Sequence, residues 1–429
     1  MLNALGLLKE RRFLPIFTTQ FLGAFNDNLF KTSMVLFATY QVYNDPKLES
    51  NFNALATGLS LLPFFLLSAL SGQLADTTDK ARIIRLVKTA EIGIMLIGAA
   101  GLMVARAGEA MPGIVLMLTS VLLLGVHSTF FGPIKYAILP QHLKPEEVLG
   151  GTGLVEAGTY LAILMGTVTA GWISVEAASI LVLLVAAIGW FAGRAVPPAP
   201  RLGPELKLDF NPLTASWRLV NATMHIPRLF MAICSISFFW AIGAVLIICF
   251  PPLVKNLLTA NQEVASLVIA IFSVGVAIGS VIINSLLKGE ISAKYAPASV
   301  LAMAGFLIAF SITTRTWTPG PEGHLYNVME FIAQPRSMLV VGTLTAVAVT
   351  GGMFVVPLYA FLTTTVTKDQ TARTVAANNV VNSGAMVIGA IFVITLTTMG
   401  VTPQDMMLVV AAMCPVAAWL ARRLHRLAD

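Results

Sequence analysis

Twelve apolar stretches, each long enough to cross a bilayer as a helix, constrain this chain more than any other feature. They cover residues 13–43, 52–75, 83–104, 112–141, 149–174, 177–196, 228–257, 263–287, 296–314, 336–365, 374–398 and 404–421. A membrane-spanning helix needs about 20 such residues. Only 11% of the chain is charged, against about 25% in soluble proteins, and short alternating strands are absent. We therefore predict an all-α membrane protein with 12 transmembrane helices.

The stretches fall into two groups of six, separated by a polar, proline-rich segment. Prolines and charges together are typical of a linker. We expect an N-terminal six-helix bundle at 1–196, a linker at 197–227 and a C-terminal six-helix bundle at 228–429. Residues 212–224 could form a short helix on the membrane surface.

Lysine and arginine are distributed unevenly between the two sides of this topology. With the N-terminus inside, 20 of the 27 fall in cytoplasmic segments, Lys88 among them, and Lys31 and Lys135 lie within spans. The outside holds Lys47, Arg106, Lys255, Arg315 and Arg336. This bias places both termini in the cytoplasm. It also accounts for the net charge of +6, so we expect no nucleic-acid partner.

No motif in the chain indicates catalysis. Metalloprotease, phosphate-binding and serine-hydrolase signatures are absent, and the three cysteines lie in apolar stretches without CxxC spacing. We expect inert thiols, no cofactor, no metal site and no enzyme activity.

The first span carries a cluster of polar groups, from Gln20 to Lys31, where lipid is expected. On a helical wheel Gln20, Asp27 and Lys31 form one narrow stripe, and Asn26 and Asn28 add two amides in the same stretch. Charges in a bilayer are costly and normally face a cavity or each other. The stripe is either a structural pair that fixes a neighbouring helix or, as we favour, a site for a polar or zwitterionic group.

Two more charges lie in the fourth and fifth spans. Lys135 follows Gly132-Pro133, which should kink the helix, and either binds an anionic phosphate or extends to the headgroups. Glu156 is either its counter-ion or a structural hydrogen-bonding group. We expect Asp27 and Lys135 to differ in depth by about 10 Å, at 1.5 Å per residue, and so to form two separate polar sites. His127 is expected to be a packing residue, and Glu91 a structural one near the cytoplasmic end.

The second half contains few intramembrane charges. Its candidate binding residues are Trp240, Tyr359, Asn378 and Asn382, of which the two asparagines lie on one helix face. A charged first half and an apolar second half suit a substrate with a charged head and an apolar tail.

The loop at 72–82, GQLADTTDKAR, resembles the loop between the second and third helices of the major facilitator superfamily. Asp76, Lys80 and Arg82 match that pattern, whereas Thr77 and Asp79 depart from it. The resemblance implies two bundles that rock about a central site, with Asp76, Lys80 and Arg82 forming a cytoplasmic gate.

Four further motifs resemble the bacterial lysophospholipid transporter family within that superfamily. They are QFLGAFNDNLFK, FGPIKYAILPQHL, GLVEAGTYLAIL and GGMFVVPL, in spans 1, 4, 5 and 10. The resemblance covers the whole chain and implies movement of lysophospholipids, such as lysophosphatidylethanolamine, from the outer to the inner leaflet of the bacterial inner membrane for reacylation. Asp27, Asn28, Lys135 and Glu156 match shared positions. A basic residue found late in span 7 of some members is replaced here by Leu246 and Ile247.

The first motif is most similar to the branch that is often fused to acyltransferase domains. The resemblance therefore implies that an acyltransferase is a partner, and because this sequence ends at Asp429 we expect that enzyme to be a separate protein. We expect the transporter itself to be a monomer among membrane lipids. Two alternatives stay open. One is a proton-coupled exporter or symporter of small amphipathic solutes, with Asp27 or Glu156 carrying the proton. The other is a non-transporting scaffold that presents lipid to an acyltransferase.

Overall fold

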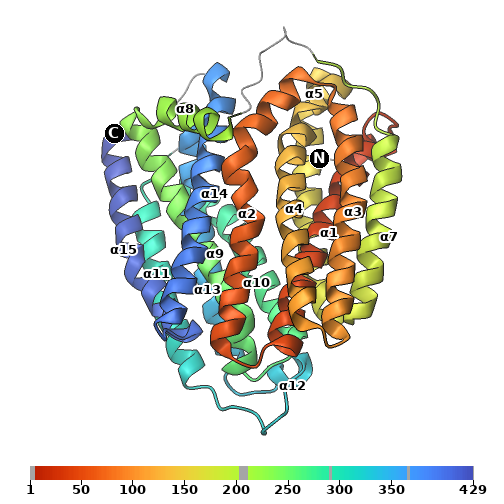
Figure 1. Cartoon of the computed structure of the whole chain (residues 1–429). Coiled ribbons are helices and arrows are strands. Elements are labelled where there is room, and N and C mark those ends of the chain that lie inside the picture. Colours follow the sequence, from red (N-terminus) through yellow and green to blue (C-terminus); the bar gives the residue numbers. More distant parts are fainter. Residues whose placement is uncertain (1–4, 202–210, 289–291, 365–367, 429) are drawn as a thin grey trace. The chain divides into compact units, whose positions relative to one another are not determined.

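A computed structural model describes residues 5–201, 211–288, 292–364 and 368–428, which are almost entirely helical and contain no strand (Figure 1). The longer helices are α1 (Leu14–Phe37), α2 (Pro46–Thr77), α3 (Lys80–Arg106), α4 (Ala110–Ala137), α6 (Pro145–Trp172), α7 (Val175–Arg194), α9 (Pro227–Asn256), α10 (Gln262–Leu287), α11 (Ala296–Arg315), α13 (Ser337–Thr364), α14 (Lys368–Thr398) and α15 (Pro403–Ala428). The shorter ones are η1 (Leu5–Lys9), the π-helix η2 (Ala38–Val42), α5 (Leu139–His142), α8 (Pro212–Met224) and α12 (Val328–Ile332).

The predicted spans and the observed long helices correspond one to one. Among the described residues, 11 helices are long and apolar enough to cross a membrane. The remaining long helix is α1, whose 24 residues give about 36 Å of length but include the polar cluster. The all-α class is thereby confirmed. The predicted linker falls partly on 202–210, outside the described residues, and its expected short helix is confirmed as α8.

One compact unit comprises Met1–Phe37 and Leu62–Ala215. Within it α3 packs on α4 and α7, and α1 packs on α6 and α7. Gly113 permits the close approach of α3 and α4, because a Cβ atom there would lie 2.5 Å from the Ala105 backbone nitrogen. Phe30, Met95 and Met117 are fully buried in this unit.

The second compact unit comprises Ala38–Leu61 and Ser216–Asp429. Most of α9 is buried, and it packs on α10, α13, α14 and α15. Gly279 and Gly352 let α10 and α13 meet at backbone distance. The division into bundles at 1–196 and 228–429 stays a prediction. Residues 38–61, which continue directly from α1, belong with this second unit.

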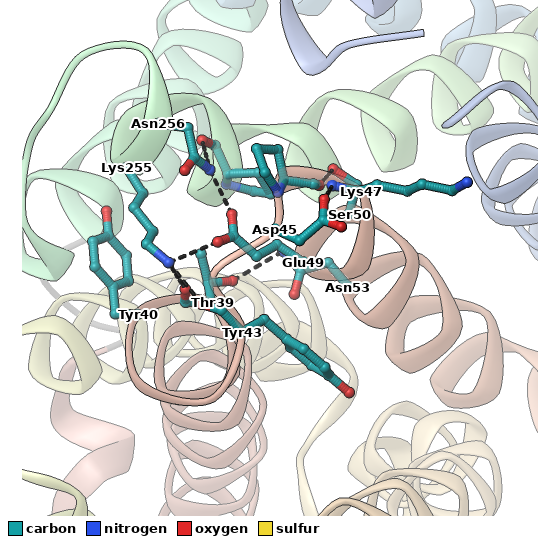
Figure 2. A network of polar contacts seen from close by, with 12 residues as sticks. Thr39, Tyr40, Tyr43, Asp45, Lys47, Glu49, Ser50, Asn53, Lys255 and Asn256 are labelled. Atoms are coloured by element: carbon teal, nitrogen blue, oxygen red, sulfur yellow. Dashed lines mark hydrogen bonds and ion pairs between the residues drawn. The ribbon is translucent and has the colours of Figure 1, made fainter. Parts of the chain in front are cut away.

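A buried ion pair holds residues 38–61 against α9 (Figure 2). The Lys255 ammonium lies 2.6 Å from Glu49 Oε1, 2.6 Å from the Thr39 carbonyl oxygen and 2.8 Å from that of Tyr43. An ammonium has three donors, and all three are matched. Asn256 Nδ2 donates to the second Glu49 oxygen at 2.5 Å. The Glu49 side chain is fully buried, so its charge depends on these partners.

The same residues explain where this chain turns. Thr39 lies in η2 and Tyr43 directly follows it, so both carbonyls belong to the last turn of the helix that continues from α1, where the helix dipole favours a cation. Glu49 lies in the first turn of α2, where the dipole favours an anion. Tyr40 donates from its hydroxyl to the Ala260 carbonyl at 2.9 Å. The turn between η2 and α2 therefore forms around the Lys255 ammonium.

Replacing Lys255 by methionine should destabilise the protein strongly, because Glu49 would remain buried without its cation. Losing one partner of a buried pair costs about 3–5 kcal/mol, and a lowered midpoint of thermal unfolding in detergent would report it. Lys47→Met is the matched control, since among the described residues that exposed ammonium reaches only the Thr398 carbonyl, at 3.4 Å.

The Lys255→Met/Glu49→Gln double variant should recover part of the loss, because the glutamine carries no charge. Equal unfolding midpoints for Lys255→Met and Lys47→Met would contradict a stabilising role for the pair.

Candidate functional site

The polar cluster of α1 divides into groups that anchor the helix and groups that remain available. Gln20 is fully buried, and its Nε2 donates to the Val155 carbonyl at 3.3 Å and to the Thr159 hydroxyl on α6. Asn28 donates to the Ala24 carbonyl of its own helix at 2.9 Å. The nitrogens of these two amides are hydrogen-bonded to backbone or hydroxyl oxygens, whereas the buried Gln20 Oε1 has no hydrogen-bond partner.

Asp27 and Lys31 are only partly satisfied. Ser128 on α4 donates to Asp27 Oδ2 at 2.6 Å, whereas Asp27 Oδ1 is buried with no hydrogen-bond partner. Asp27 and Lys31 are one turn apart, yet no ion pair joins them among the described residues. Asp27 therefore has one carboxylate oxygen free to accept a hydrogen bond from a ligand. Lys31 has an ammonium that is not paired with Asp27 and could bind an anionic group of the ligand.

A second set of charges lies beside this cluster and is fully buried. Lys88 Nζ lies 2.5 Å from Glu91 Oε2 on α3, and His127 Nε2 lies 3.2 Å from the same oxygen. Asn26 donates to Glu91 Oε1 at 3.1 Å and to the Val182 carbonyl at 3.1 Å. Glu91 therefore receives contacts from α1 and α4 in addition to its own helix.

The structure agrees with two of the expectations for these residues and adds to the third. Glu91 has a structural role in a buried pair, and His127 packs by stacking on Phe131, although it also lies 3.2 Å from Glu91. Lys88, which the charge count places in a cytoplasmic segment, has a fully buried side chain that contacts Glu91 and lies against Gly23 on α1 and Gly193 on α7. The spacing of Lys88 and Glu91, three residues apart in an apolar span, is the signal that could have identified them.

Lys135, Tyr136 and Glu156 form another polar site on α4 and α6. Lys135 Nζ lies 4.9 Å from the centre of the Tyr136 ring, a cation–π distance, and the Tyr136 hydroxyl donates to Glu156. Among the described residues Lys135 and Glu156 form no direct ion pair, because the tyrosine takes the carboxylate. All three side chains are partly exposed.

In the second unit the predicted residues meet in an uncharged cluster on α9, α13 and α14. Trp240 Nε1 donates to the Tyr359 hydroxyl at 2.7 Å, and Asn382 Nδ2 donates to the same hydroxyl at 3.2 Å. Ser237 donates to Asn382 Oδ1 at 2.7 Å. Asn378 is fully buried one turn earlier on α14. The predicted residues of this half thus form a hydrogen-bonded cluster around two aromatic rings, and none of them is charged.

The predicted gate residues cannot all be placed. The Asp76 side chain lies outside the described side chains, Lys80 is buried and Arg82 is exposed. Asp79, which departs from the superfamily loop pattern, caps α3 by accepting from the backbone nitrogens of Ala81 at 2.8 Å and Arg82 at 3.3 Å. The gating role of Asp76, Lys80 and Arg82 stays a prediction.

A cavity of about 320 Å³ lies elsewhere, in the second unit. Its walls include Lys47, Pro252, Asn256, Thr402 and Gln404. None of the predicted binding residues lines it. It adjoins the Lys255–Glu49 network through Asn256.

The buried Lys88 ammonium explains a glycine on α1. A Cβ atom at Gly23 would lie 2.8 Å from Lys88 Nζ, which Glu91 holds in place. We expect Gly23→Ala to push the ammonium away and lower stability by about 1–3 kcal/mol, as overpacking does, measured as the unfolding midpoint in detergent.

Gly93→Ala on α3 is the control, because nothing lies within 4 Å of its Cβ position. Alanine favours helix over glycine, so this variant should be as stable as the native protein or more so. A Gly23→Ala protein as stable as Gly93→Ala would show that the ammonium moves freely.

Comparisons with known proteins agree with this architecture. The family model of the Major Facilitator Superfamily matches residues 16–390. The lysophospholipid transporter LplT of Serratia proteamaculans is 27% identical over 368 residues, covering 83% of this chain and 80% of the relative. The protein of the same name from Cronobacter sakazakii is 25% identical and covers 88% and 85%.

Solved structures share the fold at low sequence identity. A bacterial homologue of the lysosomal transporter Spinster has a TM-score of 0.69 at 14% identity, covering 97% of this chain and 98% of its own. A D-xylose–proton symporter has a TM-score of 0.67 at 12% identity and covers 96% of each chain. With the helical architecture and the family match over most of its length, this chain belongs to the major facilitator superfamily and is a multi-pass membrane transporter similar to the bacterial lysophospholipid transporters.

Proposed function

We propose that this protein transports lysophospholipids, such as lysophosphatidylethanolamine, from the outer to the inner leaflet of the bacterial inner membrane for reacylation. The observation that carries the proposal is the pair of incompletely partnered charged sites in one unit. Asp27 and Lys31 form the first, and Lys135 with Glu156 the second. A zwitterionic headgroup offers one phosphate and one ammonium. The names of the relatives support the same substrate class.

The proposed roles follow from the charges that remain available. Lys135 binds the phosphate, because its ammonium contacts only the face of an aromatic ring among its described partners. Asp27 binds the headgroup ammonium through its unpartnered Oδ1. Lys31 and Glu156 adjust the charge around each site. The buried Lys88 is excluded from substrate contact, because Glu91 already neutralises it.

The acyl chain lies on apolar surface in this proposal. In the second unit Trp240 is 39% exposed, and its ring supplies an apolar face edged by the hydroxyl of Tyr359 and the amide of Asn382. Such a surface accepts a hydrocarbon chain without leaving a charge unpaired. A sugar or an amino acid would gain little from it.

Alternating access supplies the movement. The proposed gate residues Asp76, Lys80 and Arg82 lie at the end of α2 and the start of α3. We infer that this segment opens and closes during the transport cycle. The transporter acts as a monomer without a cofactor, and a separate acyltransferase consumes its product.

Uptake of fluorescent lysophosphatidylethanolamine into proteoliposomes tests this proposal. Asp27→Asn and Lys135→Met should each lower the initial rate about 10-fold or more, because a charge-assisted hydrogen bond is worth about 1.5–3 kcal/mol. Lys47→Met and Glu146→Gln, which remove exposed charges, serve as controls. Full uptake by both site variants would contradict the assigned roles, and no uptake by the native protein would contradict transport itself.

A further inference from the structure

A groove on the surface of the first unit has no part in the proposed transport. The helices α3 and α7 pack side by side (Figure 1), and a groove of about 360 Å³ lies between them. Each helix contributes four residues spaced as i, i+3, i+4 and i+7, which lie on one helix face. These residues are Leu96, Ala99, Ala100 and Met103 on α3, and Glu176, Ser179, Ile180 and Leu183 on α7. The groove therefore runs along both helices.

The shape of the groove follows from the sizes of these side chains. Ala99 and Ser179 are short and buried, so they form its floor, whereas Leu96, Met103 and Ile180 are exposed and form its edges. Seven residues of helix give about 10 Å of length, and half of a bilayer's hydrocarbon core is about 15 Å thick. Both helices are long and apolar enough to cross a membrane. The groove thus fits within one leaflet and faces acyl chains.

An ion pair lies at one end of the groove. Arg106 Nε donates to Glu176 Oε1 at 3.1 Å, and these residues belong to the last turn of α3 and the first turn of α7. Trp172, the last residue of α6, is exposed close to the start of α7. Exposed tryptophans gather at the membrane–water interface. The ion pair therefore lies at the level of the lipid headgroups.

Both members of this pair keep bonding capacity for a ligand. A guanidinium has five N–H donors, and among the described residues Arg106 uses only Nε for a side-chain contact. Its two terminal nitrogens suit a phosphate, which arginine binds with two parallel hydrogen bonds. Glu176 Oε2 can accept from an ammonium. An exposed ion pair alone would indicate little, but this one continues into an apolar groove.

We propose that the groove between α3 and α7 binds a membrane phospholipid whose headgroup carries a phosphate and a primary ammonium. The phosphate binds Arg106, the ammonium binds Glu176, and one acyl chain lies along the groove. Because the lipid contacts both helices, it stabilises their packing. The proposal does not depend on the proposed transport, since none of the residues assigned to the transported molecule lines this groove.

The test is the thermal unfolding of purified, delipidated protein in detergent as lipid is added. Phosphatidylethanolamine should raise the unfolding midpoint until the site is saturated, because a ligand of the native state stabilises it. Phosphatidylcholine has no N–H donor and phosphatidylglycerol has no ammonium, so each should bind about 10-fold more weakly or less. Equal effects of the three lipids would overturn the proposal, since they would show only a general effect of lipid.

Variants of the groove and of its ion pair test the two parts of the site. Ala100→Leu should fill the groove and abolish the stabilisation by phosphatidylethanolamine. Ala177→Leu is the matched control, because Ala177 is exposed on α7 but lies outside the groove. Glu176→Gln should lower the affinity for phosphatidylethanolamine to that for phosphatidylcholine. A native response in Ala100→Leu would overturn the proposal, and unfolding midpoints without lipid identify variants that fail to fold.

Native mass spectrometry distinguishes this groove from the proposed transport site. The native protein and Asp27→Asn should each retain one more phosphatidylethanolamine molecule than Ala100→Leu does. Loss of that molecule in Asp27→Asn but not in Ala100→Leu would place the lipid at the transport site and overturn the proposal. If the lipid is retained as expected but lysophosphatidylethanolamine uptake is absent, the proposed function fails and the lipid site remains.

Discussion

A charge inside a membrane-spanning helix must be neutralised or hydrogen-bonded, because lipid provides neither. This chain meets the requirement to different degrees at different places. Lys255 and Lys88 each have a carboxylate at 2.6 Å or less, with Glu49 and Glu91 fully buried. Such pairs fix helices in place, since breaking one exposes a charge to apolar surroundings. The remainder of the structure is arranged around these two pairs, one in each compact unit.

Incomplete satisfaction identifies a different kind of site. Asp27 retains a buried oxygen with no partner, and Lys135 has an aromatic ring where a carboxylate would be stronger. A protein that needed only stability would have little use for charges held in this way. Groups that bind a ligand, by contrast, must keep some hydrogen-bond donors or acceptors unpaired until the ligand is present. The difference between Lys88 and Lys135 is therefore a difference of function and not of residue type.

The long apolar stretches and the short helix at Pro212–Met224 were predictable because length, composition and proline positions are local properties. The polar stripe of α1 was also visible, since helical periodicity places Gln20, Asp27 and Lys31 on one face. The Lys88–Glu91–His127 cluster was not found, because its meaning depends on which helices pack together. Charge counting treats a lysine near a helix end as a marker of topology, whereas burial against Gly23 makes this one a core residue.

The two kinds of charge also depend on each other through α1. Asn26 contacts Glu91 on one side of the helix, while the next residue, Asp27, accepts from Ser128 on α4. A rigid Lys88–Glu91 pair thus fixes the orientation of α1 and holds an available carboxylate next to it. Ser128 and His127, adjacent on α4, contact both groups. The proposed ligand site at Asp27 thus adjoins, through Ser128 and His127, a buried pair whose contacts join α1, α3 and α4.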